Sequence, residues 1–113
     1  MIKIYHNPRC RKSRETLDII EKKSKEVHIV EYLKTPPNAK ELTAIVKSLG
    51  IEPVELIRKG ESIYKERYKG KDLSDKQWIE AMVEHPILIE RPIVINGAKA
   101  TLGRPPENVK KII

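Results

Sequence analysis

The chain has 113 residues, of which 39% are apolar, and it carries a formal net charge of +7 and one cysteine. This length predicts one domain with its own hydrophobic core, and the single thiol excludes a disulfide-stapled scaffold. No apolar run approaches the length that spans a bilayer, and the first residues lack a secretory hydrophobic stretch, so we expect a reducing cytoplasm and no membrane partner.

The basic charge is dispersed. Lysines are spread along the chain, no dense basic tract occurs, and the aromatic residues are four Tyr, one Trp and no Phe. This pattern favours a solvated basic surface over a nucleic-acid interface, which would need clustered cations and stacking aromatics. A net positive charge also suits a small oxyanion. A nucleic-acid binder is therefore the least favoured functional class, and no nucleic-acid partner is expected.

The first third of the chain predicts a β-α-β unit. Apolar and other residues alternate over residues 2–5, as in a short strand. After Pro8 the period becomes that of an amphipathic helix, with Leu17 and Ile20 on the apolar face. Residues 27–32 are β-branched and predict a second strand. A right-handed crossover would make the two strands parallel.

The next segment predicts helices. A break at Thr35-Pro36-Pro37 is followed by Asn38, and Glu41 stands three residues later, as in a capping pair. Apolar residues then recur at helical spacing until Gly50, which ends the helix. Residues 53–59 predict a short second helix.

A further helix is expected after a polar stretch. Residues 60–72 are glycine-flanked and predict a loop with room for a helical turn. Ser74 and Gln77 resemble another capping pair, and the helix they open ends before Pro86. Trp78 lies on its apolar face and is predicted to be a core residue.

The last part predicts a hairpin and a helix. Asn96-Gly97 is a strong turn signal between the apolar run 93–95 and residues 98–102. Gly103 and the Pro105-Pro106 pair then introduce a final helix that carries Val109 and Ile112.

The order of elements is β-α-β, then helices, then β-β-α. With the helices of about residues 38–84 taken as an insertion, this order predicts a single thioredoxin-like α/β domain over residues 1–113. The expected architecture is a three-layer sandwich around a mixed sheet.

The one thiol has an unusual neighbourhood. Cys10 lies where the first strand meets the first helix, among Arg9, Arg11, Lys12 and Arg14. Unpaired amides and the helix dipole at this end stabilise a thiolate and can hold an oxyanion, and adjacent cations act in the same direction. The alternative is a buried, inert cysteine. The position of Cys10 at a helix start and its basic neighbours both disfavour that alternative.

The residues near Cys10 in the sequence test three kinds of cysteine site: a phosphatase-type loop, a dithiol redox site and a metal site. Thr16 stands where a phosphatase-type loop needs arginine, and Ser13 stands where a dithiol site needs a second cysteine. Any disulfide must therefore form with a thiol of another molecule. His6 and Cys10 lack further nearby ligands, so no metal is expected. Ser13 alone could be a helix cap, and His6 alone could be a strand-end residue without a catalytic part.

Four segments then carry a resemblance: YHNPRCRKSR at 5–14, LIRKGE at 56–61, HPILIERPIVI at 85–95 and LGRPPE at 102–107. The first resembles the active-site segment of glutaredoxin-coupled arsenate reductases, His-Asn-Pro-x-Cys-x-x-Ser-Arg, and the likeness covers almost the whole chain. It implies a thioredoxin-like fold with a helical insertion and reduction of arsenate to arsenite in arsenic detoxification. No bound cofactor is implied; glutathione is a co-substrate and glutaredoxin a partner.

The resemblance also assigns roles. The implied catalytic residues are Cys10 as nucleophile, His6, which helps lower the thiol pKa, and Ser13. The implied oxyanion-binding residues are three arginines and two loop residues: Arg58, Arg91, Arg104, Asn7 and Arg14. Pro92 falls where thioredoxin-like proteins place a cis-proline beside the thiol, and a cis bond is therefore expected there.

The implied mechanism starts with attack of the Cys10 thiolate on arsenic. Glutathione then attacks the thiolated arsenic, arsenite leaves, and glutaredoxin resolves the mixed disulfide. A monomer is expected, because glutaredoxin must reach the thiol. Arg11 and Lys12 replace smaller neutral residues of well-known arsenate reductases, so two relatives remain as alternatives: a regulator that binds RNA polymerase, and a glutathione-dependent thiol reductase with another substrate.

Overall fold

The structure is a computed structural model that describes residues 2–23 and 26–113. The chain divides into two compact units, which are described separately. The sheet unit comprises Met1–Thr35 and Arg91–Ile113, and the helical unit comprises Pro36–Glu90. The predicted insertion of about residues 38–84 falls within the helical unit, and the single-domain organisation stays a prediction.

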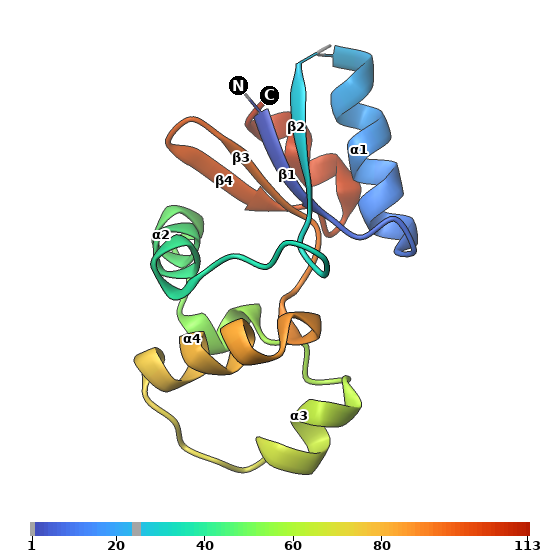
Figure 1. The fold of residues 1–113 in the computed structure, drawn as a ribbon. Coiled ribbons are helices and arrows are strands. Elements are labelled where there is room, and N and C mark those ends of the chain that lie inside the picture. Colours follow the sequence, from blue (N-terminus) through green and yellow to red (C-terminus); the bar gives the residue numbers. More distant parts are fainter. Residues whose placement is uncertain (1, 24–25) are drawn as a thin grey trace. The chain divides into compact units, whose positions relative to one another are not determined.

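The sheet unit contains a mixed four-stranded sheet (Figure 1). Its elements are β1 (Ile2–His6), α1 (Arg11–Lys23), β2 (Val27–Glu31), β3 (Ile93–Asn96), β4 (Lys99–Leu102) and the 3₁₀ helix η3 (Pro106–Lys111). The strand order is β2-β1-β3-β4, and β1 runs parallel to β2 but antiparallel to β3. The predicted β-α-β unit and mixed sheet are therefore confirmed, as the helical crossover requires.

The core of this unit lies between the sheet and its two helices. Ile4 of β1, Ile20 of α1, Val94 of β3 and Val109 of η3 belong to one apolar cluster and are fully buried. Each such side chain contributes roughly 1.5–3 kcal/mol through burial. Because α1 and η3 share this cluster, both cover the same face of the sheet, and β1 is held at its centre.

The hairpin of β3 and β4 is confirmed, but its turn is shifted by one residue. Asn96 pairs with Lys99, so the two loop residues are Gly97 and Ala98. Gly97 has φ of +62°, which a two-residue hairpin requires at its first loop position and which glycine adopts without strain. Asn96 stays in the strand, and its side-chain amide donates to the carbonyl of Ile112 at 2.5 Å.

The helical unit contains α2 (Ala39–Leu49), η1 (Pro53–Leu56), α3 (Ser62–Arg67), α4 (Asp75–Glu84) and η2 (Pro86–Leu88). Both predicted capping pairs form reciprocal bonds. The Asn38 and Ser74 side chains accept from the amides of Glu41 and Gln77, at 2.8 and 3.2 Å. Gly50 ends α2 in the left-handed conformation, as predicted.

The helix predicted over residues 53–59 is a four-residue 3₁₀ turn instead. Ile57 leaves the turn and forms a bridge with Ile89. The Arg58 amide donates to the Leu88 carbonyl at 2.7 Å, and the Glu90 amide donates to the Leu56 carbonyl at 2.8 Å. These long-range bonds take the groups that a continued helix would have used, so the prediction of a longer helix was wrong.

The polar stretch 60–72 contains the short helix α3. Tyr64, within α3, and Tyr68, which follows it, pack on Trp78 of α4, with ring centroids 6.3 and 6.0 Å apart. Trp78 is buried, as predicted for a core residue. Among the described residues, no helix has both the length and the apolarity needed to cross a membrane.

Candidate active site

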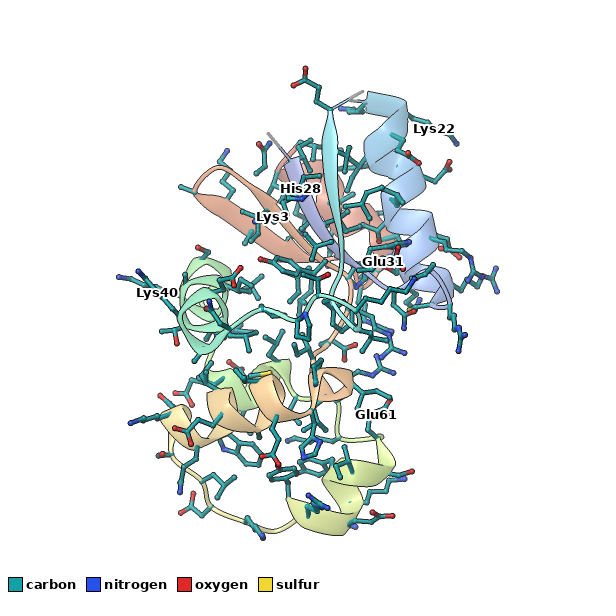
Figure 2. All side chains as sticks on the ribbon, in the orientation of Figure 1. Lys3, Lys22, His28, Glu31, Lys40 and Glu61 are labelled. Carbon is teal, nitrogen blue, oxygen red and sulfur yellow. The ribbon has the colours of Figure 1, made fainter. Side chains whose placement is uncertain are left out.

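The segment that joins β1 to α1 (ribbon in Figure 2) ends at Cys10, the residue directly before α1. The Cys10 amide donates to the Asn7 carbonyl at 3.0 Å, and the Arg9 amide donates to the Asn7 side-chain oxygen at 3.0 Å. The Cys10 carbonyl accepts from the Arg14 amide at 3.0 Å, the first bond of the helix. Cys10 is therefore the N-terminal cap of α1, a position rich in free amides.

Ser13 connects this segment to the end of β1. Its hydroxyl oxygen accepts from the Asn7 amide at 3.1 Å and lies 2.6 Å from Nδ1 of His6. The tautomer of His6 sets the direction of this bond: the hydroxyl donates to an unprotonated Nδ1 and accepts from a protonated one. All three residues are buried, so the arrangement is shielded from water. His6, Asn7 and Ser13 thus fix the course of the chain around Cys10.

The surroundings of His6 disfavour the charged form of its imidazole. Burial lowers the pKa of His6, the carboxylate of Glu31 raises it, and the charge of Arg14 lowers it, with a net result below the ordinary value. The imidazole is neutral at neutral pH and can accept the Ser13 proton. A role of His6 in lowering the pKa of the Cys10 thiol stays a prediction; its partner Ser13 bonds to the Cys10 sulfur through its backbone amide.

The sulfur lies among donors rather than hydrocarbon. Cys10 is only 9% exposed, and burial raises the pKa of its thiol. The backbone amide of Ser13, a hydrogen bond from Arg91 and the charges of Arg91 and Arg104 act in the opposite direction. Together they outweigh burial, so the pKa of Cys10 lies below its ordinary value. Nη2 of Arg104 stands 3.8 Å from Sγ.

The two arginines support each other. Nε of Arg104 donates to the carbonyl of Arg91 at 2.7 Å, which ties the start of β3 to the end of β4. Burial lowers the pKa of Arg91, but its hydrogen bond to Cys10 and its contact with Tyr32 raise it above the ordinary value. Tyr32 is 1% exposed and follows β2. Sequence reasoning missed Tyr32, because one tyrosine after a strand carries no spacing signal.

Pro92, beside Arg91, has the predicted cis peptide bond, so this expectation is confirmed. A second cis bond, at Pro105, was not predicted. The Pro92 carbonyl accepts from the Gly103 amide at 2.9 Å, which joins the two segments that carry the arginines.

Gly103 allows a close approach behind the site. A Cβ atom there would stand 2.7 Å from Cγ of Pro92 and would overlap the Thr16 hydroxyl. The Thr16 hydroxyl donates to the Lys12 carbonyl at 2.7 Å, and its oxygen stands 3.4 Å from the Gly103 carbonyl oxygen. The sequence marked Gly103 only as a breaker, because its contact partners are distant along the chain.

Two of the implied oxyanion ligands have other partners. Arg14 is exposed, and its Nη1 donates to the Pro8 carbonyl at 3.0 Å, so it closes the segment before α1. Arg58 belongs to the helical unit, where Nε donates to Glu61 at 3.2 Å and Nη1 donates to Glu90 at 2.6 Å. Its charge is balanced by two carboxylates, and a role in oxyanion binding stays a prediction.

The arrangement is chemically suited to a nucleophile beside an anion site. Guanidinium groups offer planar forks of donors that match tetrahedral oxyanions, and the start of α1 adds amides. Within the described residues, no group of three or more His, Cys, Asp or Glu side chains could hold a metal ion. Fold and site together define a thioredoxin-like protein with one activated thiol beside two arginines.

Comparison with known proteins agrees with this class. The chain belongs to the ArsC family, whose sequence model matches residues 5–112. It is 47% identical to uncharacterized protein YfgD of Escherichia coli K12, over 99% of this chain and 96% of that protein. It is also 47% identical to an arsenate reductase of Haemophilus influenzae, over 97% of each chain. The solved arsenate reductase from Vibrio cholerae is 45% identical, with a TM-score of 0.95 over 99% of this chain and 97% of that one.

Proposed function

We propose that this protein reduces arsenate to arsenite with Cys10 as its nucleophile. The observation that carries the proposal is the Cys10 sulfur, which has a lowered thiol pKa and stands 3.8 Å from a guanidinium nitrogen of Arg104. The names of the relatives support the substrate, because arsenate reductases of Haemophilus influenzae and Escherichia coli are 47% and 42% identical.

The first step joins sulfur to arsenic. The thiolate of Cys10 attacks As(V), an arsenic–oxygen bond breaks, and the oxygen leaves as water after taking up protons. Arg91 and Arg104 neutralise the oxyanion and stabilise the charge that develops on its remaining oxygens. Because both guanidinium groups are held in place before substrate binds, little reorganisation accompanies the step.

The second step needs a thiol from another molecule, since the chain has one cysteine. The external sulfur bonds to Sγ of Cys10, and the electron pair of the arsenic–sulfur bond stays with arsenic. Two sulfurs are thereby oxidised to a disulfide, As(V) is reduced to As(III), and the thiol proton leaves with arsenite. Glutathione is the proposed thiol, and glutaredoxin then resolves the mixed disulfide by thiol exchange. A monomer in the cytoplasm fits this sequence of partners.

A coupled assay tests the proposal. Purified protein, glutathione, glutaredoxin, glutathione reductase and NADPH are mixed, and NADPH oxidation is followed with and without arsenate. We expect arsenate-dependent oxidation that Cys10→Ser abolishes. Absence of that oxidation in the wild-type protein, or its persistence in Cys10→Ser, would overturn the proposal.

A second candidate is a glutathione-dependent thiol reductase with another substrate. The carboxylates of Glu61 and Glu90 favour it, since they already occupy the Arg58 guanidinium and leave two arginines at the sulfur. Reduction of a protein mixed disulfide needs less charge compensation than binding of a dianion. The same assay separates the two: turnover with a glutathionylated substrate but not with arsenate would select the thiol reductase.

A further inference from the structure

A small hollow lies beside the segment that carries Cys10. It has a volume of about 250 Å³ and lies within the sheet unit. Residues 6–9 form one wall, and Glu31, Leu33 and Lys34, at and after the end of β2, form the other. Figure 2 labels Glu31 at this end of β2. Cys10 follows the first wall in the sequence, and neither Cys10, Arg91 nor Arg104 lines the hollow itself.

The charges of the hollow suit a ligand with carboxylates. The Arg9 side chain is exposed and forms no ion pair with any residue of 2–23 or 26–113. Lys34 is 78% exposed, and its contact with Glu31 is 3.5 Å long. An exposed ion pair of this kind is weak, so the Lys34 ammonium group can leave Glu31 and bind a carboxylate of a ligand. Glu31 would then be able to receive an ammonium group.

The second wall also offers apolar surface. Leu33 is 44% exposed, which is high for a large apolar side chain between charged neighbours. The volume falls just below the range of about 300–1,000 Å³ that is typical of small-molecule pockets. It therefore suits one end of a tripeptide better than a large cofactor.

We infer that this hollow binds the carboxylate-bearing peptide part of the small thiol that reacts at Cys10. The inference rests on the proposed function, which requires an external thiol beside the cysteine. Arsenate would occupy the side with the two arginines, whereas the thiol would lie along the Asn7–Arg9 wall. Separate subsites would let both substrates reach the same sulfur, and Arg9 and Lys34 would select an anionic thiol.

A thiolation assay without arsenate tests the subsite. Glutathione disulfide reacts with the Cys10 thiolate: one new sulfur–sulfur bond forms, the old one breaks, and a glutathione thiolate leaves. Its second-order rate constant is measured by mass spectrometry and compared with that of bis(2-hydroxyethyl) disulfide, which has no charge. The ratio of the two constants reports recognition of the peptide part rather than reactivity of the thiol.

Three variants are compared. Arg9→Ala/Lys34→Ala removes both cations of the hollow, and Leu33→Trp fills it without a change of charge. Lys22→Ala/Lys23→Ala removes two charges from exposed positions at the far end of α1, where Figure 2 labels Lys22. The last variant controls for the general loss of positive charge.

We expect the ratio to fall roughly tenfold in Arg9→Ala/Lys34→Ala, as two exposed ion pairs predict. It should also fall in Leu33→Trp and stay within about twofold in the control. An equal fall with both disulfides, an equal fall in the control, or an unchanged ratio in Leu33→Trp would overturn the inference. Because arsenate is absent, a failure here leaves the arsenate assay to decide the proposed function separately.

Discussion

Replacement of Arg104 by methionine should raise the pKa of the Cys10 thiol. The guanidinium of Arg104 favours the thiolate over the thiol, so its removal shifts ionisation of the sulfur to higher pH. Arg104→Lys keeps a positive charge at the end of a side chain of similar length and is the matched control. It also loses the fork of donors, which separates charge from hydrogen-bond geometry.

The size of the shift follows from the distance. Two unit charges 3.8 Å apart interact by about 1 kcal/mol in water and by about 4 kcal/mol at an effective dielectric constant of about 20. One pKa unit corresponds to about 1.4 kcal/mol. Because Arg104 is partly exposed, solvent screens the interaction, and we expect the lower half of this range, a rise of about 1–2 units.

The assay is alkylation of Cys10 by iodoacetamide as a function of pH. This reagent is uncharged, so its rate follows the thiolate fraction alone. The midpoint should move to higher pH in Arg104→Met and should move by less than about 0.5 unit in Arg104→Lys. A midpoint that does not move in Arg104→Met, or that moves equally in both variants, would refute the electrostatic reasoning.

Three further substitutions test the structural roles of single residues, each by urea unfolding. Gly103→Ala should lower the free energy of unfolding by about 1–3 kcal/mol, because the new methyl group overlaps Thr16, and Thr16→Ala in the same chain should recover part of that loss. No loss in Gly103→Ala would contradict the close approach. Ser13→Ala should cost about 1–3 kcal/mol, since a buried amide and imidazole nitrogen lose their shared hydroxyl; a neutral effect would mean that water replaces it. Asn38→Ala should cost about 1 kcal/mol through loss of the α2 cap and leave thiol reactivity unchanged, so an altered alkylation profile would count against a purely structural cap.

Local signals in the sequence predicted the elements that local interactions stabilise. The Asn38–Glu41 and Ser74–Gln77 caps depend on residues three positions apart, and both form as expected. Gly50 likewise ends α2 because of its own backbone freedom. The parallel pairing in the mixed sheet was predictable for the same reason, because a right-handed β-α-β crossover joins elements that are adjacent in the sequence.

Long-range contacts explain the elements that were missed. The helix expected after Pro53 stops early because Ile57 pairs with Ile89, which lies far along the chain. The α3 helix forms in a polar stretch because two tyrosines pack on Trp78. Neither partner can be identified from the local pattern, so residue periodicity gave the wrong length for the first element and only a helical turn in a loop for the second.

The residues of the candidate site likewise divide into those that local sequence signals predicted and those that depend on distant contacts. The Cys10 segment was predictable because its bonds to Asn7 and Ser13 are local. Arg91 and Arg104 came from the family resemblance, since single arginines in a basic chain are not distinctive. The contact of Arg91 with Tyr32 was not predicted, because it depends on how β2 and β3 flank β1.

The central claim is that the donors around Cys10 favour its thiolate beside an oxyanion site. The most direct test is the pH dependence of Cys10 alkylation in the wild-type protein, measured with and without arsenate. We predict a midpoint below the reference thiol pKa of about 8.5 and slower alkylation when arsenate is present. A midpoint at or above that reference, or a rate that arsenate leaves unchanged, would contradict the account.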